Sequence, residues 1–487
     1  MMNMNDFNME EKDIYKLFND VKIEESEFDP MDEEVTDIEK QKIKKNLKKR
    51  IKGQRKFKAL KYFSIAAALG LICTIGIGTI SPAFAENIPI LNSITQKLND
   101  EFGSHGSYAE YSQIVNKPVT SNGITLTINE VIADDSKLVI GYTIKSNKKI
   151  QNLETFSLSM FLKVDGKMSG STGSSAGNYI DDHTYVKSEE IHTDLIKNAS
   201  KKINIALNVD EISNIKGKWN FAFSASKDQL VKNSVVFKPN IKLDFPNSIA
   251  KVDKIVFSPI DTSIFVSGNY KDKEKVKKNM EVNHDDSLMD YDYWVAYDDK
   301  GVELIPKGLG GGRGDSNTGI FNIEMQYNKL NKIPKYLTIV PCKITPSAGG
   351  SESIDKNGKE VHYTVKSKKP VEISKTIDGV YPIELSQGKM GKITIESIET
   401  DKDSTTVKYR VDGKAPYFQA QDLWIKDSSG KEVDYKSYDI RKDDSKPNEF
   451  VRQFKKLDPN KKYTIFTNDF SNVEFREDLK FTINLSK

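Results

Sequence analysis

An uncharged run of 24 residues, from Tyr62 to Ala85, constrains this chain most strongly. At about 1.5 Å per residue, a helix of this length can cross a hydrocarbon core about 30 Å thick. The preceding residues 40–61 hold twelve Lys or Arg and no acidic residue. By the positive-inside rule, the segment before the run stays in the cytoplasm and the chain after it is exported. The sequence therefore predicts a single-pass protein of the cell membrane.

The end of this run leaves a second interpretation open. Ala83 and Ala85, placed before Glu86, match the small-x-small pattern of a signal-peptide cleavage site. A leader of 61 residues and so long an apolar run are both unusual for a signal peptide. We therefore expect an uncleaved anchor, with regulated proteolysis at Ala83, Ala85 and Glu86 as a further hypothesis.

The composition argues against several classes of function. The formal charge is only +3, whereas nucleic-acid-binding domains usually carry a strongly basic face, so we expect no direct nucleic-acid partner. Two cysteines, Cys73 and Cys342, form no Cys-x-x-Cys pair, and five histidines leave little material for zinc, haem or iron–sulfur ligation. We therefore expect no metal, no cofactor and no enzymatic activity.

Two amphipathic helical patterns precede the predicted span. One places apolar residues at i, i+3, i+4 and i+7 within an acidic segment, and the other repeats them every four residues among lysines. Residues 1–61 are too few and too charged to bury these stripes in a core of their own. A partner with an apolar groove would cover them. The candidate partner-binding residues are Ile14, Leu17, Phe18, Val21, Ile43, Leu47 and Ile51.

A simpler interpretation of the same segment needs no protein partner. The acidic part would then be a solvated tail, and Lys40 to Lys61 would lie on anionic lipid headgroups and fix the topology. Membrane lipid is therefore an expected partner of the basic helix in either case.

The exported part shows an internal repeat. Ile90, Leu91, Ile94 and Leu98 first predict a short helix, after which the apolar period changes to two, as in half-buried strands. Two regions then match at a constant offset of 267 residues, and a weaker middle copy starts near Lys251. The matched residues are Ile128, Val131, Asp134, Ile140, Tyr142 and Ile144 with Ile395, Ile398, Asp401, Val407, Tyr409 and Val411.

Turn motifs favour β-sandwiches. Asp298, Asp355 and Asp427 each open an Asp-x-x-Gly turn, in which the glycine supplies the positive φ of a hairpin. Tyr336 and Tyr463 each stand six residues after a Leu, a spacing that resembles the tyrosine corner of immunoglobulin-like and fibronectin-like sandwiches.

The predicted fold is mainly β, with tandem immunoglobulin-like or fibronectin-like β-sandwiches outside, one transmembrane helix and a short helical cytoplasmic N-terminus. Cys342 is expected in a sandwich core. The predicted parts are a cytoplasmic segment (1–61), a transmembrane helix (62–85), a juxtamembrane helix and connector (86–111), and sandwiches at 112–243, 244–372 and 373–487.

Three short motifs have simpler structural explanations than functional ones. Gly173 to Gly177 matches the Gly-x-Ser-x-Gly nucleophile elbow but lacks the required strand and helix, so we expect a flexible hairpin tip. His284 to Asp292 is rich in oxygen ligands but lacks the spacing of a calcium loop. Arg313-Gly314-Asp315 is a tripeptide too short to predict integrin binding.

The chain resembles the domain-of-unknown-function 4179 family of membrane proteins from Gram-positive bacteria. The resemblance rests on the acidic stripe, the basic helix, the span ending at Ser81 to Pro89, and the segment Ser121 to Ile128. It is best over residues 10–145, and the later modules look like immunoglobulin-like domains. The resemblance implies an anti-sigma factor paired with an extracytoplasmic-function sigma factor. Residues 1–61 contain no His and no Cys, so the zinc motif of one anti-sigma class is absent from them.

Two functions from different classes follow. In the first, the protein is a signal transducer whose cytoplasmic helices sequester a sigma factor while the exported sandwiches sense the envelope. In the second, it is a membrane-anchored surface or adhesion protein whose sandwiches bind cell-wall polymer or a surface protein, and its tail serves only topology.

Overall fold

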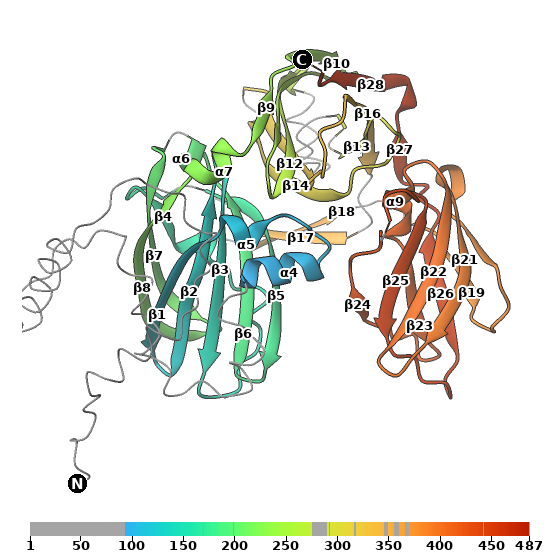
Figure 1. The fold of residues 1–487 in the computed structure, drawn as a ribbon, viewed down its shortest axis with the longest axis horizontal. Helices are drawn as coiled ribbons and strands as arrows, with labels where there is room; N and C mark the ends of the chain where they lie inside the picture. Colours follow the sequence, from blue (N-terminus) through green and yellow to red (C-terminus); the bar gives the residue numbers. More distant parts are fainter. Residues whose placement is uncertain are drawn as a thin grey trace, which may run out of the picture. The chain divides into compact units, whose positions relative to one another are not determined.

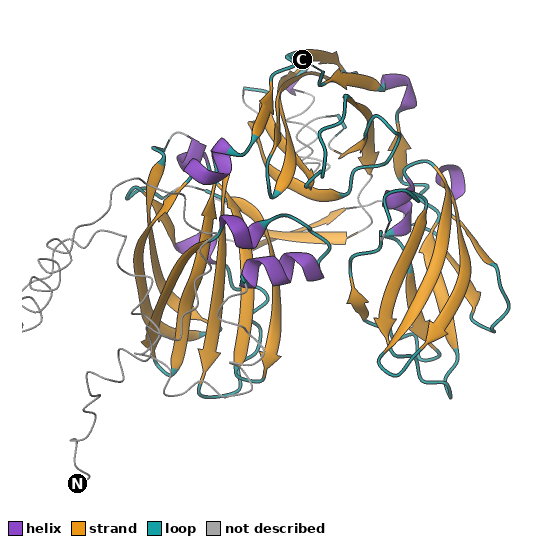
Figure 2. Cartoon of the chain, in the orientation of Figure 1, coloured by secondary structure: helices purple, strands orange, loops and turns teal. Residues whose placement is uncertain are grey.

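The computed structural model describes residues 93–486, apart from residues 169, 198, 275–289, 292, 316–317, 345–348, 355–359, 366–369 and 442. The predicted cytoplasmic segment and transmembrane helix therefore lie outside the described residues. No helix within the described ranges is long and apolar enough to cross a membrane. The described chain is mainly β, as predicted (Figure 1), and Figure 2 shows its helices as short segments between strands.

The first module is a sandwich of two antiparallel sheets. Its core centres on Trp219, which is fully buried and whose Nε1 donates to the Ile124 carbonyl oxygen at 2.9 Å. Side chains of β7 alternate between buried and exposed, as the period of two predicts. One sheet has the order β1(Gln113–Ser121)-β2(Ile124–Ala133)-β3(Lys137–Ser146)-β6(Thr184–His192)-β5(Thr172–Asp181), and the other β4(Leu162–Val164)-β7(Lys202–Ile212)-β8(Ile215–Ser226). The short helices η4(Leu158–Phe161), α6(Asp194–Lys197) and α7(Asp228–Lys232) connect or follow these strands.

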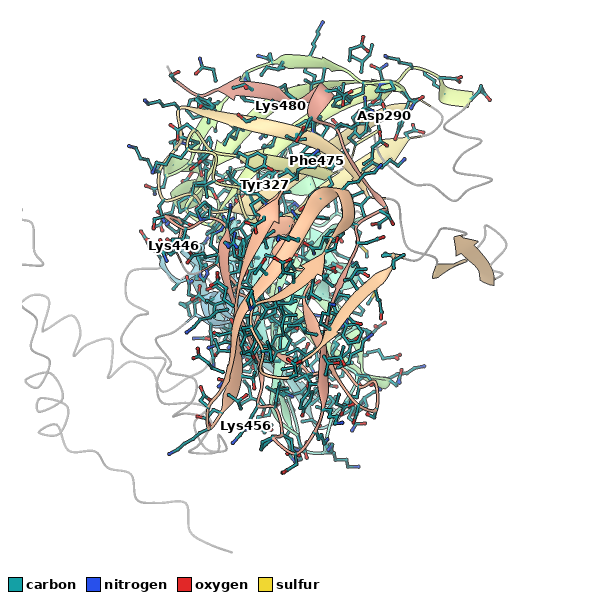
Figure 3. All side chains as sticks on the ribbon, turned by 90° about the vertical axis from the view of Figure 1, so that its right-hand side faces the viewer. Asp290, Tyr327, Lys446, Lys456, Phe475 and Lys480 are labelled. Atoms are coloured by element: carbon teal, nitrogen blue, oxygen red, sulfur yellow. The ribbon has the colours of Figure 1, made fainter. Side chains whose placement is uncertain are left out.

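The second module takes its last strands from the end of the chain. One sheet has the order β10(Ile241–Asp244)-β11(Ser248–Phe257)-β12(Asp261–Tyr270)-β15(Ile320–Asn328)-β14(Pro306–Asp315), with β9(Val235–Phe237) beside β11. The other joins β13(Tyr293–Tyr297) and β16(Tyr336–Ile344) to β27(Val473–Phe475) and β28(Phe481–Asn484). Inside, the Tyr327 hydroxyl, labelled in Figure 3, donates to the Trp294 carbonyl oxygen at 2.8 Å.

This arrangement differs from the predicted boundary at 373–487. Ile483 and Leu485 are buried in the core of the second module, not the third. The physical reason is that β13 and β16 alone leave that core open, and β28 both pairs with β16 and covers it with apolar side chains.

The third module is a sandwich of the strands β19 to β26. One sheet has the order β20(Ile383–Ser386)-β21(Gly391–Thr400)-β22(Ser404–Gly413)-β25(Glu449–Lys455)-β24(Tyr435–Ser437), and the other β19(Glu372–Thr376)-β26(Tyr463–Asn468)-β23(Trp424–Asp427). Helices α9(Pro416–Ala420) and η5(Gly388–Met390) border these strands, whereas η6(Glu477–Leu479) lies between β27 and β28 and packs on the second module. A separate hairpin of β17(Gly349–Ile354) and β18(Glu360–Val365) lies between the second and third modules in the sequence.

The strand register confirms the internal repeat. Ile128 lies opposite Tyr142, and its counterpart Ile395 lies opposite Tyr409, with an irregularity in register directly after Ile128 and directly after Ile395. The middle copy has the same irregularity after Val252. The three hairpins β2–β3, β11–β12 and β21–β22 therefore share one pattern of pairing and one β-bulge position.

Two of the predicted turns are confirmed, and the third begins outside the described residues. Gly301 and Gly430 have φ values of 80° and 82°, in the left-handed region that glycine adopts without strain. The Tyr463 hydroxyl accepts from the Asp458 N–H at 3.0 Å, which confirms the local hydrogen bond of a tyrosine corner. The Tyr336 hydroxyl instead donates to the Asp299 carbonyl oxygen, so that second corner is not formed.

The short motifs are located as follows. Gly173 to Gly177 lies within strand β5, not at a hairpin tip, because each of its residues pairs with a residue of β6. Gly173 packs so closely on β6 that a Cβ there would collide with the Glu190 carbonyl oxygen. Arg313 to Asp315 ends strand β14. Most of the acidic segment His284 to Asp292 lies outside the described residues. Cys342 is buried, as predicted.

Candidate functional site

The segment that opens the described chain, residues 93–112, forms a strap that includes helices α4(Ile94–Glu101) and α5(Tyr108–Tyr111). The Ser93 side chain caps α4 by accepting from the Gln96 N–H. Ile94 and Leu98 are buried against Val186 of β6, which confirms the described half of the predicted amphipathic helix. Its other half, with Ile90 and Leu91, lies outside the described residues.

Glu130 of the first module anchors the start of this strap. Its carboxylate accepts from the Thr95 N–H at 2.7 Å and from the Ser93 hydroxyl at 2.9 Å. One turn further, Asn99 Nδ2 donates to the Ser188 hydroxyl at 3.4 Å. Because the Glu130 side chain is buried, these bonds fix the helix on the sheet more firmly than exposed ones would.

The rest of the strap contacts the other two modules. Asn328 Nδ2 of the second module donates to the Gly103 carbonyl oxygen at 2.6 Å. The Tyr438 N–H of the third module points to the Glu101 carbonyl oxygen at 3.5 Å, and the Tyr438 ring stacks on Phe102 with centroids 5.0 Å apart. The strap therefore joins all three modules.

Next to the strap, a charged cluster joins the first two modules. Lys137 Nζ donates to the Asp261 carboxylate and lies 3.5 Å from Glu190. Lys307 Nζ lies 3.2 Å from Glu190 and 3.6 Å from Asp261. Lys137 opens β3 and Asp261 opens β12, so the two modules meet at equivalent positions of the repeat. The cluster consists of Lys137, Glu190, His192, Asp261, Lys307 and Glu324.

Burial and mutual attraction oppose each other in this cluster. Burial disfavours the charged form of Glu190, but Lys137 and Lys307 outweigh it and hold the pKa of Glu190 well below its usual range. His192 lies 2.9 Å from Glu190 and 3.4 Å from Glu324. Burial lowers the pKa of His192, yet the bonds to these two carboxylates outweigh it and raise the pKa to about 9. At neutral pH His192 is therefore protonated beside an ionised Glu190.

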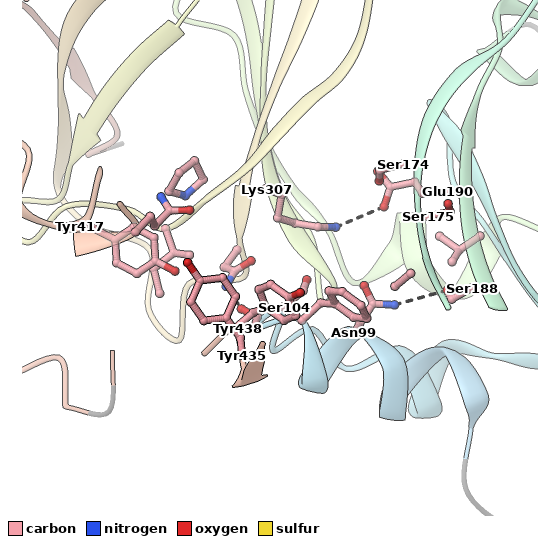
Figure 4. A pocket seen from close by; sticks show the side chains of 18 of the residues that line it. Asn99, Ser104, Ser174, Ser175, Ser188, Glu190, Lys307, Tyr417, Tyr435 and Tyr438 are labelled. Atoms are coloured by element: carbon pink, nitrogen blue, oxygen red, sulfur yellow. Dashed lines mark hydrogen bonds and ion pairs between the residues drawn. The ribbon is translucent and has the colours of Figure 1, made fainter. Parts of the chain in front are cut away.

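A cavity of about 400 Å³ opens where the strap meets the three modules. Figure 4 shows three tyrosines at one side of it and Glu190 with Ser174, Ser175 and Ser188 at the other, and Lys307 reaches toward Glu190. Its labelled lining residues are Asn99, Ser104, Ser174, Ser175, Ser188, Glu190, Lys307, Tyr417, Tyr435 and Tyr438. Within the described residues, no group of three or more His, Cys, Asp or Glu side chains could hold a metal ion.

The site residues predicted from the sequence all lie outside the described residues and stay predictions. They are Ile14, Leu17, Phe18, Val21, Ile43, Leu47, Ile51, Ala83, Ala85 and Glu86. Sequence reasoning missed the charged cluster and the cavity. The run Lys187 to His192 carries four charged or titratable side chains, but only the structure shows that its strand is buried along its whole length.

Two family models match the chain. "Domain of unknown function (DUF4179)" matches residues 55–146, and "Family of unknown function (DUF5643)" matches residues 234–385. No curated protein matches it.

Solved structures give weak likenesses. "The crystal structure of the conserved domain protein from Bacillus anthracis" is 23% identical with a TM-score of 0.41, over 56% of this chain and 93% of that one. A "Marsupial T cell receptor" is 6% identical with a TM-score of 0.13, over 75% of this chain and 99% of that one. At these scores neither likeness supports an inference about this chain.

Proposed function

This chain belongs to the family described as "Domain of unknown function (DUF4179)", and from that premise we propose that it is a single-pass membrane signal transducer of the anti-sigma type. In this proposal, the helices before residue 62 sequester an extracytoplasmic-function sigma factor. The three exported modules sense a condition of the envelope. Regulated proteolysis near Ala83 to Glu86 then releases the partner.

The strap is the observation that best supports a transducing role. Residues 93–112 follow the predicted span within a few residues, and hydrogen bonds tie them to the first module through Glu130, to the second through Asn328 and to the third through Tyr438. In this proposal, a change in how the modules pack would therefore reach residues 93–112, which follow the predicted span closely in the sequence. A protein in which the span served only as an anchor would have no need of such bonds.

The partner-binding half of the proposal can be tested in the native host with the full-length, tagged chain. We expect a sigma factor to co-purify and to be identified by mass spectrometry. The double change Ile14→Asp with Phe18→Asp should abolish its recovery, because two carboxylates would enter the apolar contact.

The matched control is Lys16→Asp, which alters the polar face of the same predicted helix and should leave recovery unchanged. Recovery of no sigma factor with the unaltered chain, at normal abundance of the protein, would contradict the proposal. Equal loss in the control and the double variant would show that the apolar stripe is not the binding surface.

The cavity favours a second candidate function, a surface or adhesion protein whose modules bind cell-wall polymer or a surface protein. Deletion of residues 1–35 separates the two. An adhesive role should survive the deletion, whereas sigma-factor control should be lost and the regulon expressed constitutively. Reporter expression from the regulon, measured beside attachment of whole cells, distinguishes these outcomes.

A further inference from the structure

One side of the cavity at the strap is aromatic. Tyr417, Tyr435 and Tyr438 of the third module line it together with Phe102 of the strap. The Tyr438 and Phe102 rings stack with an interplanar angle of 13°, and Tyr438 is 46% exposed. Tyrosine rings offer an apolar face with a polar edge, which suits ligands that are partly apolar and partly hydroxylated.

The other side presents neutral hydrogen-bonding groups beside the ion pair of Lys307 and Glu190. Ser174 on β5 and Ser188 on β6 carry hydroxyls, and Asn99 on α4 carries an amide. Such groups both donate and accept, as sugar hydroxyls do. The volume of about 400 Å³ is within the range of small-molecule sites, about 300–1,000 Å³, and towards its lower end.

Arg452 contributes a cation to the lining that makes no direct ion pair within the described residues. It is 3% exposed, its Nη2 donates to the Gln421 carbonyl oxygen at 3.0 Å, and its guanidinium lies 4.5 Å from the Tyr435 ring centroid. In the part of the chain that the structure describes, no carboxylate lies within ion-pair distance of it, whereas Lys307 is paired with Glu190. The charged lining residues therefore sum to one positive charge.

From these three features we propose that the cavity binds a sugar that carries one carboxylate. The C–H face of the ring lies against the tyrosines, the sugar hydroxyls meet the serines and Asn99, and the carboxylate is attracted to Arg452. Two sources share this chemistry, namely a lactyl-bearing amino sugar and a uronic acid. The claim that this sugar is the sensed signal rests on the proposed function, whereas the binding of the sugar does not.

Isothermal titration calorimetry on the full-length chain, purified in detergent, tests this directly with N-acetylmuramic acid, glucuronic acid, N-acetylglucosamine and lactate. We expect at least one acidic sugar to bind about tenfold more tightly than N-acetylglucosamine, which lacks the carboxylate. Binding of only one acid identifies the source. Equal binding of the neutral sugar, equal binding of lactate, or binding of none of the four would overturn the proposal.

Variants of the lining place the ligand in this cavity. Tyr438→Ala should lower the affinity for the acidic sugar about fivefold or more. Tyr438→Phe, which keeps the ring, should bind the sugar nearly as tightly as the unaltered chain does. Arg452→Gln should remove the preference for the acid over the neutral sugar. If thermal unfolding shows that this buried change prevents folding, Ser174→Trp replaces it, because Ser174 is exposed, lines the cavity and lies opposite Glu190 in the sheet. Unchanged affinity in Tyr438→Ala and Ser174→Trp would overturn the assignment.

The assay also separates this inference from the proposed function. It contains no sigma factor, so a failure to bind sugar would leave sigma-factor recovery unaffected. Conversely, the double change at Ile14 and Phe18 should leave the sugar affinity unaltered.

Discussion

The first and second modules meet through buried charged side chains, whereas the second and third meet through an apolar cluster. At the first junction, the charged cluster lies beside a small apolar patch around Tyr108 and Ile260. At the second, apolar side chains of β13 and β16 pack against the third module, and the cluster is Val295, Val340, Cys342, Met390 and Ala415, with Phe418, Phe470 and Phe475 against it.

The second junction also contains one buried acid. The Glu303 carboxylate accepts from the Tyr417 N–H at 2.7 Å and the Phe418 N–H at 3.2 Å, at the start of α9. Burial outweighs these bonds and raises the pKa of Glu303 to about 7. In addition, the chain crosses this junction twice, because β27 and β28 return to the second module after the third is built.

The difference indicates where the exported part can move. An ion-pair junction depends on each partner being present and charged, since one unpaired buried charge is costly. An apolar junction that is also crossed by two chain segments keeps its apolar contacts and both crossings when a single charge changes. We therefore expect the first module to move relative to the other two, with the strap following it.

The largest effect is expected at the charged junction. Lys137→Met leaves Asp261 and Glu190 buried with one cation fewer, and should lower the free energy of unfolding by about 3–5 kcal/mol. Urea denaturation of the full-length chain measures it. The double variant Lys137→Met with Asp261→Leu should be less destabilised than the single one, because it removes the unpaired charge as well. A single-variant loss below about 1 kcal/mol, the value of an exposed pair, would contradict a charge-dependent junction.

A smaller effect, confined to the second module, is expected from its C-terminal strand. Ile483→Ala leaves a cavity in that core and should cost about 2–5 kcal/mol. Hydrogen exchange should rise in β13 and β16 but not in the first module. Ile320→Ala, at a side chain that is 53% exposed, is the control and should change stability by no more than about 0.5 kcal/mol. Exchange that rises only in the third module would mean that β28 belongs there.

The two junctions should lose stability in different pH ranges. The folded-state pKa of His192, about 9, is above its ordinary value of 6.5, so its contribution is complete below pH 6.5 and is lost as the pH rises through 9. The pKa of Glu303 is also raised, from 4.5 to about 7, so its contribution is complete below pH 4.5 and is lost as the pH rises through 7. Each loss can reach roughly 3 kcal/mol.

Thermal unfolding measured from pH 4 to 10 checks these ranges. His192→Gln should remove the fall in unfolding temperature only between pH 6.5 and 9, and Glu303→Gln should remove it only between pH 4.5 and 7. If one variant flattened both ranges, the two junctions would not be independent, and the comparison between them would fail.

The smallest effect is expected away from both junctions. Tyr463→Phe removes the hydroxyl that accepts from the Asp458 N–H, and should cost about 1 kcal/mol with no change in either pH range. Tyr336→Phe, whose hydroxyl bond to Asp299 is long and exposed, should cost less. Equal costs would show that the corner at Tyr463 has no special role.

Local patterns were sufficient to predict the hairpins. The alternation from Ile124 to Ile128 and the repeat at Tyr142 and Tyr409 depend only on neighbouring side chains, and the structure has strands and bulges at those positions. The amphipathic spacing of Ile94 and Leu98 likewise predicted α4. These features are encoded within a few residues, so a single sequence is enough to find them.

Two other features depend on residues far apart in the chain. The alternating pattern of β28 would be the same whichever sheet it joined, so Ile483 carried no sign that its partner was β16. Lys137 and Asp261 are 124 residues apart, and each taken alone looks like a turn residue at the start of a strand. Only the tertiary structure shows that the repeat brings them together.

The return of β27 and β28 to the second module also sets an order of events during synthesis. Chains generally fold domain by domain as they leave the ribosome, beginning at the N-terminus. Here the first module can close as soon as Ser226 has emerged, but the second must wait for Ile483, after the third has already been made. A prematurely terminated chain would thus carry a half-built middle module with an open apolar core, a form that proteases can recognise and remove before it reaches a partner.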